Sequence, residues 1–189
     1  MTMQSSQELR DRGNNARDNI PEELHAKYSL NICHRFLHSG LFFRAKNIAC
    51  YLPSGSEVDT SLIFERAWQA KKRVFVPVVK KRHKMRFVQI ERNTRLERNQ
   101  YGIWEPVSGN EISAAKLDVV VTPLVVFDEK LNRIGMGGGY FDRYFSFLKC
   151  DRQWFRPKLV GFAFECQKVE KIGPNPWDIR LYRVLTESN

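Results

Sequence analysis

The sequence predicts a three-layer α/β/α fold with a mostly parallel central sheet and a small antiparallel excursion. Strand-like apolar segments alternate with helix-like segments along most of the chain, which is typical of parallel sheets. Residues 117–127 form an apolar run that reads as a strand buried on both faces, as parallel strands are. With 189 residues and 42% hydrophobic content, the chain can bury one core of ordinary size. We expect one α/β domain, residues 1–189, with an N-terminal helical segment at about 5–40 and an α/β core at about 45–189.

Two helices are expected in the N-terminal segment. Residues 8–19 are polar and helix-compatible, although Gly13 lowers their helix propensity. Pro21 followed by two glutamates is a favourable helix start, and this second helix should stop near Ser39 and Gly40. Its apolar spacing predicts four inward-facing residues: Leu24, Tyr28, Ile32 and Phe36.

The first half of the core predicts a strand at residues 47–52, a turn at 53–56 and a helix that Thr60 caps and that runs to Gln69. A second strand is expected at 74–79. Residues 85–90 should pair with a later segment as an outlying hairpin.

The second half begins with the strand at 117–127, interrupted by Pro123. A glycine-rich connection leads to a helix expected at 140–148, and the last expected strand covers 158–164. We find no internal repeat.

The glycine-rich connection is the most informative motif. Residues 133–143 read RIGMGGGYFDR, with four glycines within five positions. Glycines let a ligand approach the backbone, and a strand, glycine loop and helix in succession can offer N–H groups to a phosphate. A flexible turn is the alternative, but Asp142 and Arg143 favour a site. The loop is neither a dinucleotide fingerprint, because Tyr140 stands where glycine is needed, nor a P-loop.

Three further residues could join this loop. In parallel sheets ligands lie beyond the carboxyl ends of the strands, so residues 52–57 and 135–142 should converge there. Glu57 could instead cap a helix, Asp178 could be a turn residue, and Arg10 could be an exposed helix arginine. Asp142 would favour a helix start whatever its function. Together these groups suit phosphoryl transfer by positioning rather than by a covalent nucleophile.

Composition limits the partners. The net charge is +10, and residues 71–98 hold eleven Lys or Arg against two acids. This segment could be a solvated hairpin, a nucleic-acid patch or a basic rim for a polyanionic small molecule. Because aromatic residues are not interleaved with the bases, we expect no nucleic-acid partner. No apolar run is long enough for a membrane span and the N-terminus is polar, so we expect no membrane partner and a cytoplasmic protein.

Cysteine and histidine give no support for nucleophilic or metal chemistry. The four cysteines, Cys33, Cys50, Cys150 and Cys166, lie far apart with no C-x-x-C pair, so we expect reduced, structural thiols. His34 and His38 are four residues apart without the glutamate of H-E-x-x-H.

The run at 133–143 closely resembles the signature of the 5-formyltetrahydrofolate cyclo-ligase family. The resemblance covers nearly the whole chain, with further matching segments at 9–10, 51–60, 101–106, 118–128, 160–163, 170–172 and 177–178. It implies a ligase that uses ATP and Mg²⁺ to close 5-formyltetrahydrofolate, with or without a polyglutamate tail, to 5,10-methenyltetrahydrofolate. We expect a monomer.

The resemblance also implies site residues. ATP would be bound by Arg10, Arg133, Ile134, Gly135, Met136, Gly137, Gly138, Gly139, Tyr140 and Phe141. The folate would contact Leu52, Glu57, Met136, Gly137, Gly138, Gly139 and Tyr140. Mg²⁺ would be held by Asp142 and Asp178, and Tyr140 and Arg143 would be catalytic.

The chain departs from the family pattern at two places. Ser6 stands where family members often have a lysine, and Met136 and Gly138 stand where some have basic residues. Arg133, Arg143 or a base from residues 71–98 could compensate. Two alternatives stay open: a related α/β sugar-phosphate isomerase or CoA-transferase-like enzyme, and a non-catalytic folate- or nucleic-acid-binding module.

Overall fold

The computed structural model describes residues 4–80, 84–99, 102–149 and 157–188. Its α-helices are α1 (Ser6–Asp18), α2 (Glu22–Leu37), α3 (Gly40–Arg44), α4 (Ser61–Gln69) and α5 (Tyr140–Tyr144). The 3-10 helices are η1 (Ala114–Lys116), η2 (Ser146–Lys149) and η3 (Glu165–Gln167). The strands are β1 (Asn47–Ala49), β2 (Arg73–Lys80), β3 (Lys84–Ile90), β4 (Leu96–Arg98), β5 (Trp104–Pro106), β6 (Glu111–Ile112), β7 (Val119–Thr122), β8 (Val126–Phe127), β9 (Arg133–Ile134), β10 (Lys158–Phe162) and β11 (Arg183–Leu185).

The main sheet has seven strands in the order β11-β10-β7-β1-β2-β3-β6. The five strands from β11 to β2 are parallel neighbours, whereas β3 runs antiparallel to β2 and β6 antiparallel to β3. Two small antiparallel pairs, β4-β5 and β8-β9, stand apart from this sheet. The predicted mostly parallel sheet with a small antiparallel excursion is confirmed.

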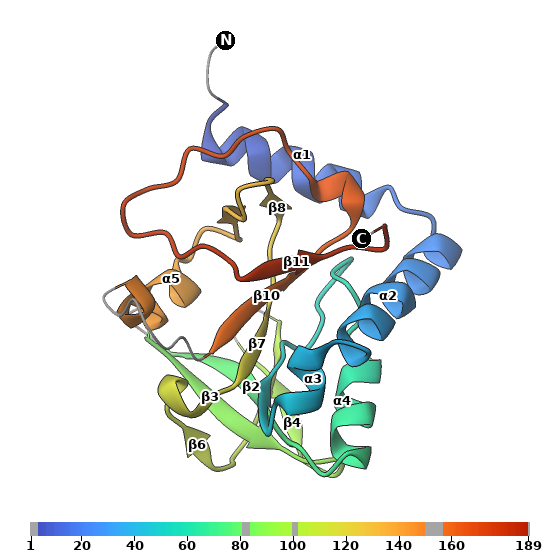
Figure 1. The fold of residues 1–189 in the computed structure, drawn as a ribbon, viewed down its shortest axis with the longest axis vertical. Helices are drawn as coiled ribbons and strands as arrows, with labels where there is room; N and C mark the ends of the chain where they lie inside the picture. Colours follow the sequence, from blue (N-terminus) through green and yellow to red (C-terminus); the bar gives the residue numbers. More distant parts are fainter. Residues whose placement is uncertain (1–3, 81–83, 100–101, 150–156, 189) are drawn as a thin grey trace.

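Helices lie on both sides of the sheet. Figure 1 shows α2, α3 and α4 on one side and α5 on the other, while α1 crosses one end of the molecule beside the C-terminal part of the chain. Buried side chains of α2, α4 and one sheet face form the larger core cluster, with Phe36, Ile63 and Phe162 among its members. The opposite face packs Phe87, Leu117 and Phe145. The predicted three-layer arrangement is confirmed.

Several strand predictions need correction. The first strand ends at Ala49 rather than residue 52, and the chain then crosses the end of the sheet. The apolar run at 117–127 is two strands, β7 and β8, with Pro123 between them, and β8 pairs with β9 outside the main sheet. β3 pairs with the later β6, as expected, but it also pairs along its whole length with β2, so it belongs to the main sheet. The strand β11 was not predicted.

Three helix predictions were also wrong in detail. The helix expected at 140–148 is a five-residue α-helix followed by the 3-10 turn η2. Leu24 is 38% exposed rather than inward-facing, although Ile32 and Phe36 are fully buried as predicted. Thr60 occupies the N-cap position of α4 without capping it, because its hydroxyl donates to the carbonyl of Tyr51. The Ser61 N–H is accepted instead by the Asp59 carboxylate.

The thiols of Cys33, Cys50 and Cys166 are free, as expected, and the first two are buried. Cys150, Tyr101 and the basic residues 81–83 lie outside the described residues. Among the helices of the described ranges, none combines the length and apolarity that a bilayer crossing requires.

The helix α1 is held against β8 by a close backbone approach. Leu9 of α1 packs in a small buried cluster with Val125, Val126 and Ile134. A Cβ atom on Gly13 would lie 2.5 Å from the Val126 Cγ1 and 2.6 Å from the Val125 carbonyl oxygen. Gly13 is therefore the residue that lets α1 dock on the strands that lead into the glycine loop.

We predict that Gly13→Ala lowers the free energy of unfolding by about 1–3 kcal/mol, because overpacking against β8 outweighs the helix-propensity gain of about 1 kcal/mol. Urea unfolding measures this difference. Asn15→Ala, on the exposed face of α1, is the matched control and should be neutral or stabilising. If both substitutions stabilise the protein, the close approach of α1 to β8 does not limit the packing.

Candidate active site

A cavity of about 1240 Å³ lies beyond the carboxyl ends of β1 and β7. The chain continues from β1 to β2 on one side, and β7 leads to β10 and β11 on the other, so β1 and β7 flank the point where strand order reverses. Ligands of open α/β sheets bind in this crevice. The residues that line the cavity include Arg10, Leu52 and Glu57, residues 133–143 and residues 175–178. The structure therefore brings together the segments that the sequence predicted would converge.

The glycine loop lines this cavity with its backbone. Gly137 and Gly139 have φ of +99° and +61°, which L side chains rarely adopt. Within the described residues, the N–H groups of positions 136–139 have no protein acceptor. Unpaired backbone N–H groups facing a cavity are a ready site for an anion.

Two arginines brace the carbonyl side of the same loop. The Arg10 Nε donates to the Gly135 carbonyl oxygen at 2.9 Å, and an Arg143 terminal nitrogen donates to the Gly138 carbonyl oxygen at 2.7 Å. With both carbonyl oxygens bonded to cationic side chains, the peptide groups that follow Gly135 and Gly138 are held in place. The side chain of Arg143, predicted to be catalytic, is thus folded back onto the loop.

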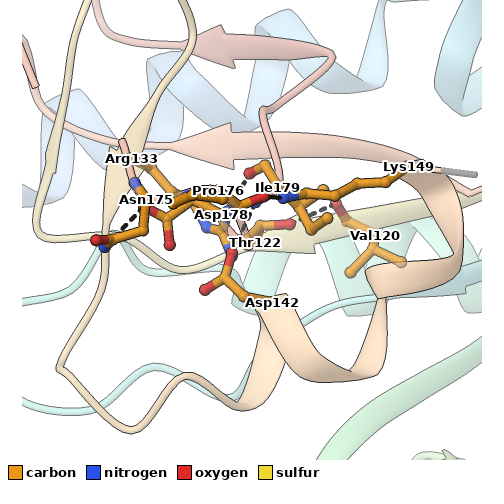
Figure 2. A network of polar contacts seen from close by, with 9 residues as sticks. All are labelled: Val120, Thr122, Arg133, Asp142, Lys149, Asn175, Pro176, Asp178 and Ile179. Carbon is orange, nitrogen blue, oxygen red and sulfur yellow. Dashed lines mark hydrogen bonds and ion pairs between the residues drawn. The ribbon is translucent and has the colours of Figure 1, made fainter. Parts of the chain in front are cut away.

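Arg133 is buried and ties three segments together. Its guanidinium donates to the carbonyl oxygen of Ile179 and, at 3.1 Å, to the Asp142 carboxylate (Figure 2). Its side chain is only 4% exposed. The guanidinium that sequence reasoning assigned to ATP is therefore already paired with the protein at the cavity wall.

The two predicted metal ligands lie on neighbouring segments. Asp142 accepts on Oδ1 from Arg133 and, at 2.9 Å, from the N–H of Ile179, the residue after Asp178 (Figure 2). Asp178 accepts on Oδ2 from the N–H of Asn175 at 2.7 Å and from its side-chain amide at 3.3 Å. Each carboxylate keeps one oxygen without a donor among the described residues.

This donor set fits a magnesium ion whose remaining ligands are phosphate oxygens and water. No group of three or more His, Cys, Asp or Glu residues that could hold a metal is found within the described ranges. Mg²⁺ is commonly bound by one or two carboxylates together with substrate phosphates and water, rather than by a protein cage. Asp142 and Asp178 provide that number of carboxylates beside the glycine loop.

Glu57 also lines this cavity. Burial raises the pKa of its carboxyl group, and a 3.0 Å hydrogen bond from the Ser54 N–H and the charge of Arg17 partly offset that rise. The neighbouring Tyr51 is buried, donates to the Val58 carbonyl oxygen at 3.1 Å, and also has a raised pKa because of burial. Glu57 lines the cavity, as the sequence predicted. Its alternative role as a helix cap is not observed, because its carboxylate accepts from Ser54 within the preceding turn and Asp59 accepts from the first N–H of α4.

The remaining predicted residues differ in how they meet the cavity. Met136 is 71% exposed at the cavity wall, whereas Ile134 is buried under α1. Tyr140 and Phe141 line the cavity and also pack against the second core cluster. The Phe141 ring meets that of Phe87 edge-on, with centroids 6.5 Å apart.

The lining residues that sequence reasoning did not assign to the site include Arg17, Trp104, Glu105 and Trp177. Arg17 lies seven positions after Arg10 on α1, a helical spacing that could have signalled a shared face. Glu105 accepts from the Val79 N–H at 2.9 Å and from the Asn99 amide at 2.8 Å, which secures the β4-β5 pair over the cavity. Trp104 is 44% exposed with the Arg98 guanidinium 5.1 Å above its ring. Trp177 directly precedes Asp178, which the sequence placed at the site, so its position next to a predicted site residue was the available signal.

Comparison with known proteins agrees with this geometry. A model of the 5-formyltetrahydrofolate cyclo-ligase family matches residues 2–187. The 5-formyltetrahydrofolate cyclo-ligase of Haemophilus influenzae is 38% identical over 75% of this chain and 76% of its own. The Escherichia coli K12 protein of the same name is 36% identical over 76% of this chain and 79% of its own.

Solved structures show the same fold. The 5,10-methenyltetrahydrofolate synthetase of Aquifex aeolicus superposes with a TM-score of 0.83 at 27% identity, covering 97% of this chain and 90% of its own. The synthetase of Mycoplasma pneumoniae, at 22% identity, has a TM-score of 0.77 over 97% of this chain and 99% of its own.

We predict that Gly137→Ala destabilises the protein more than Gly135→Ala. A side chain at Gly137 must adopt a φ of +99°, which costs about 1–3 kcal/mol, whereas Gly135 has no such φ and no atom within 4 Å of an added Cβ. Urea unfolding of both variants measures the difference. Equal free energies of unfolding would show that the loop relaxes freely and is not held in one conformation.

Proposed function

This chain belongs to the 5-formyltetrahydrofolate cyclo-ligase family, and from that premise we propose that it closes 5-formyltetrahydrofolate to 5,10-methenyltetrahydrofolate in a Mg²⁺-dependent reaction that converts ATP to ADP and phosphate. The observation that carries the proposal is that the glycine loop, with its unpaired N–H groups, and Glu57 line the same cavity. It is large enough for the reacting ends of two substrates.

The chemistry explains why a phosphate cradle must face a folate. The N5-formyl group is an amide, so its carbon is a weak electrophile and its oxygen a poor leaving group. Transfer of the γ-phosphoryl group of ATP to the formyl oxygen corrects both defects. N10 then attacks the formyl carbon, the C–O bond breaks, and inorganic phosphate leaves with the methenyl cation formed.

The protein's part in this reaction is positioning and charge stabilisation. The N–H groups of residues 136–139 would donate to phosphate oxygens, while Arg10 and Arg143 keep the loop's carbonyls turned away. Asp142 and Asp178 would hold Mg²⁺ through their remaining oxygens, and the ion when bound neutralises phosphate charge. Tyr140 would contact both substrates where the loop enters α5.

The folate would lie toward Leu52 and Glu57. A carboxylate at this wall can accept hydrogen bonds from the pterin's N–H groups, and Leu52 offers an apolar surface to its ring. The half-buried surroundings that raise the pKa of Glu57 also strengthen such hydrogen bonds.

The departures from the family pattern have local candidates for compensation. Ser6 lines the cavity without a charge. Arg10, Arg143 and Lys149 line the same cavity, and Lys149 donates to the carbonyl oxygen of Pro176. We propose that Arg10 and Arg143 supply the positive charge that the family otherwise places on a lysine.

The family match sets aside the sugar-phosphate isomerase and CoA-transferase-like alternatives. A monomer, a cytoplasmic location and the absence of a nucleic-acid partner stay predictions. Retention of the protein on DNA without folate turnover would favour the binding-module alternative.

The direct test mixes the protein with 5-formyltetrahydrofolate, ATP and Mg²⁺ and follows the absorbance of the methenyl product. We expect product only when ATP and Mg²⁺ are both present, with ADP formed in equal amount. Turnover without ATP, or no turnover in the complete mixture, would overturn the proposal.

We predict that Asp142→Asn keeps the fold but loses most Mg²⁺-dependent turnover, by roughly a hundredfold or more. Asparagine still offers an oxygen to Arg133 and Ile179, but its amide nitrogen cannot bind a cation. Initial rates over a Mg²⁺ titration measure the loss, and circular dichroism checks the fold. Asp11→Asn, on the exposed face of α1, is the control. An unchanged Mg²⁺ response would remove Asp142 from the metal site.

We predict that Glu57→Gln raises KM for 5-formyltetrahydrofolate about tenfold or more and leaves KM for ATP nearly unchanged. Because burial raises the pKa of Glu57 above its ordinary 4.5, the wild-type kcat/KM for folate should fall as pH drops through that raised pKa. The acid limb should disappear in the variant. Exposed Glu23 replaced by Gln serves as control. Equal effects on both substrates would count against the assignment.

A further inference from the structure

Arg17 is a buried arginine that lines the cavity and has no part in the scheme above. It is 8% exposed and lies seven residues after Arg10 on α1, about 10 Å further along the helix axis. Arg10 reaches the glycine loop, whereas Arg17 reaches the wall that carries Glu57. A buried arginine needs partners, and those of Arg17 point to its role.

Arg17 donates to the Asn14 side-chain oxygen on its own helix at 3.3 Å, and its partner outside α1 is the loop before Glu57. The Arg17 Nε donates to the Ser56 hydroxyl oxygen at 2.9 Å, and the Ser56 hydroxyl in turn donates to the Asp18 carboxylate. The ring of His25, on α2, bonds to the Ser56 carbonyl oxygen at 3.0 Å. Ser56 is therefore held from both N-terminal helices, and the next residue in the chain is Glu57.

Arg17 also acts on Glu57 through its charge. Burial disfavours the ionised carboxylate, and the positive charge of Arg17 is one of two influences that oppose this, the other being the Ser54 N–H. Other titratable groups near this wall are Asp18 on α1, His25 on α2 and Tyr51 after β1. Of the charged groups near this wall, Arg17 is the one whose positive charge lowers the pKa of Glu57 and so favours its ionised form.

We propose that Arg17 is a positioning residue for Glu57: it fixes the 54–57 loop through Ser56 and places a permanent positive charge beside the carboxylate that receives the pterin. The inference rests on the proposed function, since it deepens the role of the folate wall. In this proposal α1 helps to position the folate through Arg17 as well as the nucleotide through Arg10.

Three variants separate the two actions of Arg17. Arg17→Met removes both the anchor and the charge, Arg17→Lys keeps the charge without the guanidinium fork, and Ser56→Ala keeps the charge and removes the anchor. Arg12→Met, on the exposed face of α1, is the matched control. For each variant, kcat/KM for 5-formyltetrahydrofolate is measured as a function of pH, and KM for ATP is measured separately. Quenching of tryptophan fluorescence by the folate, without ATP, measures folate binding.

For Arg17→Met we expect KM for folate to rise about tenfold, the folate to quench more weakly, and KM for ATP to stay within about twofold. Loss of the positive charge raises the pKa of Glu57 further, so the acid limb should move to higher pH. In Arg17→Lys the acid limb should fall at the wild-type pH, but the affinity for folate should stay below that of the wild type. Ser56→Ala should weaken folate binding without moving the limb.

The outcomes distinguish this inference from the proposed function. If the wild-type protein neither binds nor converts the folate, the proposed function fails and this inference with it. If the wild type is active and Arg17→Met behaves as Arg12→Met does, the inference alone is wrong. It is also wrong if Arg17→Met raises the KM for folate and the KM for ATP equally. The same holds if the acid limb of the pH profile lies at the same pH in Arg17→Lys as in Arg17→Met, because a purely structural role predicts both results.

Discussion

The ion pair between buried Arg133 and half-buried Asp142 is the constraint on which the site depends. These residues stand at the two ends of the glycine loop, and the 3.1 Å contact between them closes it. Burying a charge pair costs desolvation that its mutual attraction rarely exceeds, unless further hydrogen bonds satisfy both groups. Here Ile179 supplies them, because its carbonyl oxygen accepts from Arg133 and its N–H donates to Asp142. The pair thus specifies a loop conformation more than it adds to stability.

A closed loop is useful only if its N–H groups face the ligand. Arg10 and Arg143 bind carbonyl oxygens of the loop, so the peptide groups at Gly135 and Gly138 cannot turn over without losing a charge-assisted hydrogen bond. The N–H groups are then oriented before any phosphate arrives, and no reorganisation is needed during phosphoryl transfer. Because Arg133 occupies one oxygen of Asp142, the carboxylate offers its other oxygen in a fixed direction. One ion pair sets both the anion cradle and the candidate metal ligand.

Sequence patterns predicted the parts of this structure that are local or strongly apolar. The order of strands and helices follows from burial on both sheet faces, and the glycine loop stands out because no regular element tolerates such a run. Predictions failed where distant partners decide: Thr60 bonds to Tyr51 instead of capping α4, and β11 is a three-residue strand that forms only because β10 lies beside it. The hydrogen bond from Arg17 to Ser56 spans 39 positions, which no local pattern reveals.

Helix α1 lies outside the layers of the sheet, yet it touches both sides of the cavity. Its docking on β8 requires the missing side chain of Gly13, so the helix sits at a fixed depth against the strand pair that begins the glycine loop. From that position Arg10 contacts the loop proposed to bind ATP and Arg17 contacts the loop proposed to bind folate. Phosphoryl transfer demands that the two substrates be held within about 0.5 Å of the productive geometry. A rigid helix that holds both binding loops meets this demand more directly than the sheet does, since β1 and β7 end before either loop begins.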